Sequence, residues 1–292
     1  MNKQKSLLEL HNLSFSFDRN KTLDKKAYSA RTEGERTDGT QRSRSSALDG
    51  VNLSLHSGQI LGLVGASGAG KSSIARAILR LIDVDQGEIL LNGDDICKMS
   101  AQQLGHVRRR IQIVFQNPSA SLSPRRSIRD TLIEPLRHFK IDNHSEQNEK
   151  INETIRTVGL EEDVLDRFPD QFSSGQQQRI AIARALITDP DLLIADEAVS
   201  ALDVSVQAQI LQLFRSLQSS RGISILFISH DLAAVRQIAD SVAVMDRGRI
   251  VEQSTADAFF GGPSHPYSRS LLALALSQTK AVVKEDESAM KI

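Results

Sequence analysis

The sequence predicts an α/β fold in which parallel strands form a central sheet and helices cover it. Short apolar runs at 60–64, 192–195, 223–228 and 242–245 are separated by stretches with helical periodicity. Strands that alternate with helices along a chain usually pair in parallel. The runs lack the polar alternation of a half-exposed strand, so we expect each of these strands to be buried on both faces.

The first part of the chain contains a long polar segment between two ordered regions. Residues 7–17 end in alternating serine and apolar side chains, which predicts a strand. Residues 18–46 are almost entirely polar or charged, which predicts a solvated insertion that contributes little to a core. The apolar pattern resumes after this insertion, and a helix is expected over 71–81.

The middle and the end of the chain predict a helical lobe and a short C-terminal helix. A strand is expected at 111–115 and a mostly helical lobe over 117–186. A turn at 246–248 is expected to lead into a hairpin, followed by a helix over 267–276 and a polar, mobile tail from 278 onward. We expect the helical lobe to be interrupted at Pro118, Pro124, Pro135 and Pro169.

The composition excludes several classes of function. Among 292 residues, 36 Lys and Arg balance 36 Asp and Glu, so a global positive field that attracts nucleic acid is absent. With 4% aromatic residues, a base-stacking surface is not expected, and a single cysteine excludes an intramolecular disulfide. The sequence has no signal-like apolar stretch and no window of about 18 apolar residues, so we expect any membrane contact to be made through a partner.

A Gly-rich loop directly after the run 60–64 predicts a site for the phosphates of a nucleoside triphosphate. Residues 65–72 are Gly-Ala-Ser-Gly-Ala-Gly-Lys-Ser and match the P-loop pattern at every position. Backbone N–H groups of such a loop surround phosphate oxygens, Lys71 adds a full positive charge, and Ser72 supplies a hard oxygen ligand for Mg²⁺. The alternative is a chance Gly-rich turn. The expected phosphate-binding residues are Gly65, Ser67, Gly68, Ala69, Gly70, Lys71, Ser72 and Ser73.

Polar residues at the ends of other predicted strands complete an expected catalytic set. Asp196 is expected to bind Mg²⁺ and Glu197 to activate the attacking water. Gln116 is placed to bridge metal and water, and His230 to hydrogen-bond the γ-phosphate. Taken alone, each is equally compatible with a solvated polar residue, but the carboxyl ends of parallel strands meet at one edge of a sheet. The expected catalytic residues are Lys71, Gln116, Glu197 and His230, and the expected metal ligands are Ser72, Gln116 and Asp196.

The segment 172–179, Phe-Ser-Ser-Gly-Gln-Gln-Gln-Arg, resembles the Leu-Ser-Gly-Gly-Gln signature of the nucleotide-binding subunits of ABC transporters. The resemblance covers nearly the whole chain outside 18–46 and the last residues. It implies a P-loop NTPase core with a parallel sheet, an antiparallel β subdomain and a helical subdomain at about 117–186. The ATPase domain is then 1–253, and 254–292 is a C-terminal extension with the sequence His-Pro-Tyr at its start.

The resemblance also implies how a bound nucleotide is enclosed. In this family the signature of one subunit closes on ATP held by the P-loop of the other, so that ATP joins a head-to-tail dimer. A further loop crosses the same interface, and an aromatic residue near the first strand stacks on adenine. The residues implied in these roles are Ser173, Gly175 and Gln176 in the signature, Asp203 in the crossing loop, and Phe17 at the adenine, with Phe15 as an alternative.

Three positions depart from the family pattern. Ser174 replaces a glycine of the signature and adds a side chain where backbone approaches phosphate closely. Phe172 replaces the usual leucine, and Ala198 stands where many relatives have proline. The departures within the signature predict a site that binds or hydrolyses ATP less well than the family pattern.

Within the family, segments 115–125, 198–209 and 265–267 resemble the branch that imports dipeptides, oligopeptides or nickel. The implied function is an ATP-binding and ATP-hydrolysing subunit that powers a membrane importer, with peptides as the favoured cargo and nickel as the alternative. A DNA-repair type ABC ATPase is an alternative from a different class. Such ATPases usually separate the P-loop from the signature by a long coiled coil, and no sustained heptads occur here.

The resemblance implies ATP and Mg²⁺ as cofactors and places the chain peripherally on the cytoplasmic side of the inner (plasma) membrane. The implied partners are transmembrane permease subunits and a second ABC ATPase, identical or different. A substrate-binding protein outside the membrane is coupled indirectly, and nucleic acid is not a partner. A basic cluster near Gln116 is either a solvated helical face or a docking surface for the permease; it comprises residues 108–110, Arg125, Arg126 and Arg129.

Overall fold

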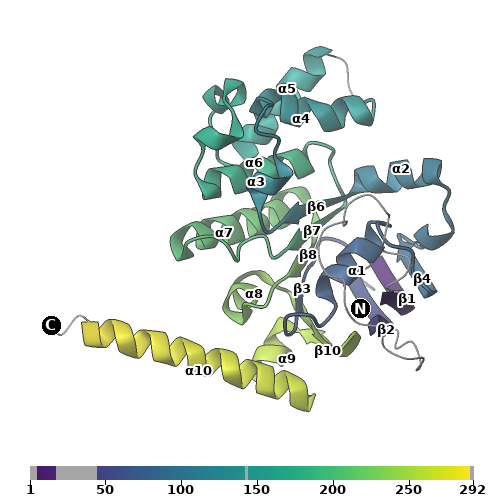
Figure 1. Cartoon of the computed structure of the whole chain (residues 1–292), viewed down its shortest axis with the longest axis vertical. Helices are drawn as coiled ribbons and strands as arrows, with labels where there is room; N and C mark the ends of the chain where they lie inside the picture. Colours follow the sequence, from purple (N-terminus) through teal and green to yellow (C-terminus); the bar gives the residue numbers. More distant parts are fainter. Residues whose placement is uncertain (1–4, 18–44, 142–143, 290–292) are drawn as a thin grey trace, which may run out of the picture.

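The computed structural model describes residues 5–17, 45–141 and 144–289 of the chain; the side chains of Phe17, Ser45, 144–145 and 278–289 are outside this description. A six-stranded sheet lies at the centre, with a four-stranded sheet on one side of it (Figure 1). A group of helices, α3 to α6, lies together at one end of the molecule (Figure 1).

The central sheet has the strand order β10-β9-β3-β8-β7-β6. The five strands from β9 to β6 form four parallel pairs, and β10 adds an antiparallel edge through a hairpin with β9. The predicted parallel sheet is therefore present, and every predicted apolar run lies in one of its strands. The strands are β3 (Ile60–Val64), β6 (Ile111–Phe115), β7 (Leu192–Asp196), β8 (Ser224–Ile228), β9 (Ser241–Asp246) and β10 (Arg249–Thr255).

This sheet separates two hydrophobic cores, because successive side chains of a strand point to opposite faces. In β3, Ile60 and Val64 belong to the core under the helical lobe, whereas Leu61 and Leu63 belong to a second core on the other face. The same alternation holds in β7, β8 and β9. The expectation of strands buried on both faces is confirmed for β3 and β8, whose residues are all buried.

The smaller sheet is antiparallel, with the order β2-β1-β4-β5, and closes the second core. Because β2 begins at Ser45, the last two residues of the predicted 18–46 insertion belong to a strand; residues 18–44 lie outside the described part of the chain. The strands are β1 (Ser6–Phe17), β2 (Ser45–His56), β4 (Gln86–Leu91) and β5 (Asp94–Asp95), and the short helix η1 (Ile96–Lys98) follows β5.

Helices lie on both sides of the central sheet (Figure 1). The lobe between β6 and β7 is mostly helical, as its periodicity predicts, and contributes α3 (Pro118–Ser121), α4 (Ile128–His138), α5 (His144–Thr157), η2 (Glu162–Asp166), η3 (Pro169–Gln171) and α6 (Ser174–Leu186). The others are α1 (Lys71–Ile78), α2 (Ala101–Arg110), α7 (Val204–Arg221), α8 (Leu232–Ile238), α9 (Ala256–Gly261) and α10 (Pro266–Ala289).

Helix α1 ends earlier than the sequence predicts, and the cause is a C-terminal capping motif. The N–H of Leu81 bonds the carbonyl of Arg76, and the N–H of Arg80 bonds that of Ala77. Arg80 has φ +52°, the left-handed conformation that ends helices in this motif. An arginine in that position, where glycine is more usual, gives little sign of the helix end in the sequence.

Two further helices differ from the prediction. Pro135 lies inside α4 and does not interrupt it. The missing N–H costs one hydrogen bond, but Ile128, Leu132 and Leu136 are fully buried on one face of the helix, and this packing offsets the cost.

Helix α10 extends past the predicted end at 276 to Ala289, because a polar segment of good helix formers does not stop a helix. Figure 1 shows α10 running outward from the body of the protein.

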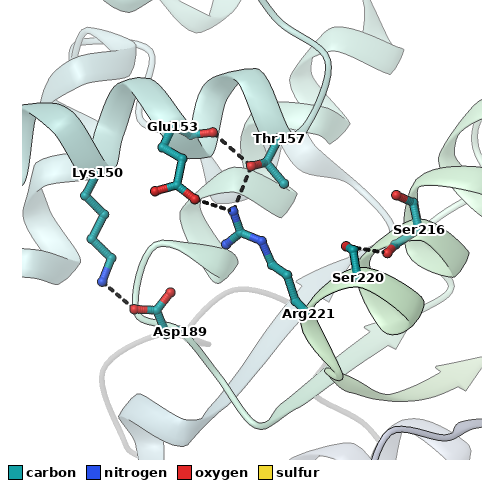
Figure 2. A network of polar contacts seen from close by, with 7 residues as sticks. All are labelled: Lys150, Glu153, Thr157, Asp189, Ser216, Ser220 and Arg221. Carbon is teal, nitrogen blue, oxygen red and sulfur yellow. Dashed lines mark hydrogen bonds and ion pairs between the residues drawn. The ribbon is translucent and has the colours of Figure 1, made fainter.

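A polar network joins the helical lobe to α7, which packs on the central sheet (Figure 2). The Arg221 guanidinium at the end of α7 donates to a Glu153 carboxylate oxygen at 3.0 Å and to the Thr157 hydroxyl at 2.8 Å. Lys150 donates to the Asp189 carboxylate after α6. These pairs are partly exposed, so each contributes at most about 1 kcal/mol, and the buried apolar residues supply most of the adhesion between the two parts.

The close approach of β3 to α8 gives a test of the packing. A Cβ on Gly62 would lie 2.6 Å from Cγ1 of Val235, so Gly62→Ala should destabilise the protein by roughly 1–3 kcal/mol. Gly105→Ala is the matched control: its Cβ would meet nothing within 4 Å, and alanine inside α2 should stabilise by up to about 1 kcal/mol. Urea unfolding measures both, and shifts of the same sign would contradict this packing.

Candidate active site

The Gly-rich loop connects β3 to α1 and is fixed by close contacts with neighbouring strands. A Cβ on Gly65 would lie 2.1 Å from the Met245 carbonyl oxygen of β9, and one on Gly70 would lie 2.5 Å from the Ala47 carbonyl oxygen of β2. Gly70 also has φ +110°, which L side chains rarely adopt. Glycine is therefore required at both positions by the fold itself, which brings the loop backbone to the start of α1.

Lys71 is a buried cation. Its side chain is 5% exposed, and its ammonium donates to the carbonyl oxygens of Gly65 at 2.8 Å and Ala66 at 3.0 Å. Burial lowers the pKa of Lys71, while the negative charges of Glu197 and Asp196 act in the opposite direction. Within the described residues no carboxylate forms an ion pair with Lys71, so its charge is not neutralised at contact distance. Such a site fits an anionic ligand such as a phosphate group.

Ser72 and Asp196 meet at the end of β7. The Ser72 hydroxyl donates to Oδ1 of Asp196 at 3.2 Å. Burial raises the pKa of Asp196, the hydrogen bond from Ser72 acts against this, and the neighbouring charge of Glu197 raises it further. A hydroxyl and a carboxylate side by side are hard oxygen donors, so this pair fits Mg²⁺. Among the described residues, no cluster of three His, Cys, Asp or Glu side chains forms a separate metal site.

Glu197 has an unusual backbone conformation, with φ +51°. Its N–H donates to the Ile228 carbonyl at 2.9 Å, and its carbonyl accepts from the N–H and the hydroxyl of Ser200. One carboxylate oxygen lies 3.3 Å from Nδ1 of His230, which follows β8. A left-handed non-glycine residue held by several hydrogen bonds is typical of functional sites, where strain positions a side chain.

A cavity of about 670 Å³ brings the predicted residues together. Its walls include Ser67 and Ser72 from the loop, Gln116 after β6, and Asp196 and Glu197 after β7. A second cavity of about 300 Å³ is lined by Ser67, Gly68, Gly70, Lys71, Ser72, Ser73 and Glu197. The structure thus gathers the ends of β3, β6, β7 and β8 at one edge, as the parallel arrangement predicts.

The signature residues lie elsewhere in the chain. Ser173 is the N-cap of α6, where its hydroxyl accepts the N–H of Gln176 and the Gln176 side chain accepts the N–H of Ser173. Gly175 is buried against α7, because a Cβ there would lie 2.4 Å from Cγ1 of Val206. Among the described residues that line the two cavities above, none belongs to the signature. One copy of the chain does not bring these motifs together.

The departures from the family pattern are accommodated by local contacts. Ser174 is the first residue of α6 and is exposed, so its side chain does not disturb the packing of this helix. Phe172 is buried, and the guanidinium of Arg167 lies 4.4 Å from the centre of its ring. This cation–π contact gives the aromatic residue a partner that leucine would lack.

The structure describes the side chain of Asp203, predicted in the interface loop, but not that of Phe17, predicted to stack on adenine. Asp203 stands at the N-cap position of α7 without a side-chain capping hydrogen bond. It is exposed and lies next to Val204, which is 85% exposed. Phe17 ends β1, but its side chain lies outside the described part of the chain, so the structure does not test its proposed contact with adenine. The alternative, Phe15, is half-buried and packs against the second core.

Among the described residues, three of the six arginines of the basic cluster form ion pairs with neighbouring acids. Arg110 pairs with Asp191 at 2.6 Å, Arg126 with Glu134 at 2.6 Å and Arg129 with Asp166 at 3.4 Å. These internal pairs favour the solvated-face interpretation of the cluster.

The helices in the described part of the chain include none with the length and apolar character needed to span a membrane.

Sequence reasoning missed two residues at the site. Arg76 lines the larger cavity, and its positive charge partly opposes the burial that raises the pKa of Asp196. Arg76 lies one helical turn after Ser72 on α1, and residues at this spacing share a helix face, so the sequence already indicates that Arg76 lies near the phosphate-binding residues. In the sequence, Tyr267 stands out only as part of the His-Pro-Tyr motif at 265–267. In the structure its hydroxyl accepts the N–H of Ala66 at 3.3 Å. No sequence pattern indicates a contact between residues so far apart.

Residues 48–200 match a sequence model of the ABC transporter family. The chain belongs to this family. The oligopeptide transport ATP-binding protein OppF of Streptococcus mutans is 41% identical over 271 residues, which are 92% of this chain and 82% of that protein. OppF of Lactococcus lactis is 46% identical over 228 residues, 78% of this chain and 71% of that protein.

A solved structure has the same fold. It is a dimeric ATP-binding cassette in a post-hydrolysis state bound to ADP and Pi, with a TM-score of 0.70 at 26% identity, covering 86% of this chain and 99% of that one. The resemblance and the α/β fold class inferred from the motifs are confirmed. This ABC protein is a nucleotide-binding ATPase subunit of a transporter.

Replacing Asp196 by Asn should stabilise the nucleotide-free protein at neutral pH. Burial raises the pKa of Asp196, so its charge is costly in the folded state, and an amide removes this cost while it still accepts from Ser72. The melting temperature at pH 7 should rise by roughly 2–4 °C. The gain should shrink as pH falls through the raised pKa of Asp196 and should vanish below the ordinary aspartate pKa of about 4, where the carboxyl is protonated in both the folded and the unfolded state.

The matched control is Asp94→Asn, at an exposed position in β5, which should leave the melting temperature unchanged at every pH. Differential scanning calorimetry of the three proteins across this pH range makes the comparison. A lower melting temperature for Asp196→Asn at pH 7 would show that the half-buried carboxylate stabilises the nucleotide-free protein. That result would contradict the statement that its charge is costly in the folded state.

Proposed function

We propose that this chain binds ATP with Mg²⁺ and hydrolyses it to power the import of peptides through a membrane permease. The observation that carries the proposal is the edge of the central sheet, where Lys71, Ser72, Asp196, Glu197 and Gln116 line adjoining cavities. The names of the similar proteins, which are oligopeptide transport and peptide import ATP-binding proteins, support peptides as the cargo.

Each residue has a role that follows from its position. Lys71 and the N–H groups of the loop bind the phosphates, and Ser72 with Asp196 would hold Mg²⁺, which supplies charge neutralisation on the phosphate oxygens. Glu197 accepts a proton from the attacking water, because its carboxylate faces the larger cavity. His230 contacts this carboxylate and keeps it oriented, and Gln116 contributes an amide to the lining of the same cavity.

A second ABC subunit, identical or different, would complete the site. Ser173, Gly175 and Gln176 would then bind the triphosphate held by the other chain, and Asp203 would lie in the interface. Two observations support this: no signature residue lines the cavities of its own chain, and the neighbouring Val204 exposes most of its apolar side chain. The similar solved cassette is itself a dimer.

The remaining parts of the proposal concern the assembly. The chain would attach to transmembrane permease subunits at the cytoplasmic face of the membrane, and a substrate-binding protein would act on it through the permease.

The ATPase domain would comprise residues 1–253 and the C-terminal extension residues 254–292. The boundary between them lies close to Thr255, where β10 ends. Between the P-loop and the signature, the longest described helix is α5 with 14 residues, so the described residues of this interval contain no long coiled coil.

Two substitutions should separate nucleotide binding from hydrolysis. Lys71→Ala removes the buried positive charge, so calorimetry should detect no ATP binding. Glu197→Gln keeps the charge of the loop but removes the proton acceptor, so ATP should still bind while hydrolysis falls by at least roughly 100-fold. The second variant should accumulate as an ATP-bound dimer in size-exclusion chromatography. Glu149→Gln, at an exposed position of α5, is the control and should hydrolyse ATP normally. Normal turnover by Glu197→Gln would remove Glu197 from the catalytic role.

The cargo is tested in the assembled transporter. The chain is co-purified with its permease, reconstituted in vesicles and mixed with binding protein that carries peptide, carries nickel or is empty. We expect the peptide-loaded protein alone to accelerate ATP hydrolysis, since cargo can reach the ATPase only through the permease. Acceleration by the nickel-loaded protein instead would replace peptide by nickel, and hydrolysis that responds to neither would overturn the importer assignment.

A further inference from the structure

The C-terminal extension contacts the phosphate-binding loop through one hydrogen bond. The backbone N–H of Ala66 donates to the hydroxyl of Tyr267 at 3.3 Å. Tyr267 lies in the first turn of α10, beyond the ATPase domain proposed above, and it packs partly against the core under the helical lobe. The ring is therefore fixed by packing, and its hydroxyl is placed over the loop.

The turn that leads into α10 is held in a defined shape by Glu252 of β10. Its two carboxylate oxygens accept the N–H groups of Ser264 at 2.9 Å and His265 at 3.0 Å. The N–H of Tyr267 then donates to Nδ1 of His265, and Arg269 donates to the Ser264 carbonyl at 2.8 Å. A turn bonded at this many points sets the position of the Tyr267 hydroxyl relative to the sheet.

The hydrogen bond acts on the peptide group that also holds Lys71. The N–H of Ala66 and the carbonyl of Gly65 belong to the same peptide group, and that carbonyl accepts the Lys71 ammonium at 2.8 Å. Tyr267 and Lys71 thus bind opposite edges of one planar unit. Rotation of this unit would turn the carbonyl away from the ammonium, and the glycine on one side lowers the resistance to such rotation.

Helix α10 also borders the other end of the site. Ala275 lines a cavity of about 320 Å³ together with His230, Ser200 and Gln207. The same helix therefore reaches both the loop that binds the phosphates and the residue that contacts Glu197.

We propose that Tyr267 is a positioning residue for nucleotide binding: its hydroxyl fixes the peptide group between Gly65 and Ala66, and through it the Lys71 ammonium. The C-terminal extension thereby sets the affinity of the P-loop for the triphosphate. This inference rests on the proposed ATP-binding function and extends it to a segment outside the motifs that define the family.

The test is Tyr267→Phe in the full-length chain, which removes the hydroxyl and keeps the ring and its packing. The dissociation constant for ATP and the KM for ATP should rise roughly two- to tenfold, the range expected for one hydrogen bond. The kcat at saturating ATP should change little, because no catalytic group is removed. Ser270→Ala is the matched control, because it removes a hydroxyl from the same helix. Among the described residues, that hydroxyl bonds only the Pro266 carbonyl. The ATP affinity of this variant should equal that of the unaltered protein.

Three outcomes decide between a positioning role and a structural one. Weaker ATP binding by Tyr267→Phe with an unchanged melting temperature of the nucleotide-free protein supports the proposal. A lower melting temperature with unchanged ATP affinity, or equal losses of affinity in Tyr267→Phe and Ser270→Ala, overturns it.

The unaltered chain separates failure of this inference from failure of the proposed function. If the unaltered chain binds no ATP, the proposed function fails. If it binds ATP only as tightly as Tyr267→Phe does, the proposed function stands and this inference fails.

A second variant tests the path through the turn. Glu252→Gln keeps one carbonyl oxygen and loses the charge that holds Ser264 and His265, so ATP affinity should fall in the same direction. If Glu252 acts on the loop only by placing Tyr267, the double variant should bind ATP no more weakly than Tyr267→Phe alone. Losses that multiply would show that Glu252 acts independently, which contradicts this path.

Discussion

Burial of the central strands on both faces is the constraint on which the site depends. Because each strand feeds two cores, a slip by one residue would move every side chain to the wrong face. The register is therefore fixed, and it places Phe115 beside Asp196 and Asp196 beside Ile228. The next residues of each strand, Gln116, Glu197 and the segment to His230, consequently leave the sheet at one level. Packing that has no chemical role thus determines where the chemical groups meet.

The charged groups at this edge of the sheet, Lys71 and Asp196, lower the stability of the nucleotide-free protein because burial disfavours their charged forms. Burial disfavours the ammonium of Lys71 and the carboxylate of Asp196, and their pKa values move toward neutrality in both cases. Neither group has an oppositely charged contact partner among the described residues; carbonyl oxygens and one hydroxyl are their nearest polar neighbours. A metal–triphosphate complex carries complementary charges of both signs. Binding would therefore relieve two unfavourable burials at once, which gives a preorganised site its affinity.

The sequence was sufficient where local patterns control the structure and insufficient where tertiary contacts do. Short apolar runs located the five parallel strands of the central sheet, and the turn at 246–248 indicated the hairpin that adds β10. The Gly-rich loop with its following residues located the cavities. The end of α1 and the continuity of α4 were missed, because a left-handed Arg80 and an internal Pro135 depend on capping and packing rather than on propensity. The bond between Ala66 and Tyr267 was missed for a stronger reason: it follows from how β10 and α10 fold back, which no local pattern specifies.

The capping box at the start of α6 bears on how the proposed dimer recognises its ligand. Ser173 and Gln176 already satisfy two backbone N–H groups of this helix within the chain. An incoming phosphate must compete with these bonds or use the N–H groups that remain. A weakly charged ligand gains little from that exchange, whereas a triphosphate gains from the helix dipole as well. The helix end is therefore stable alone and favours strong anions, so in the proposed dimer the closure of the two subunits would depend on the nucleotide that lies between them.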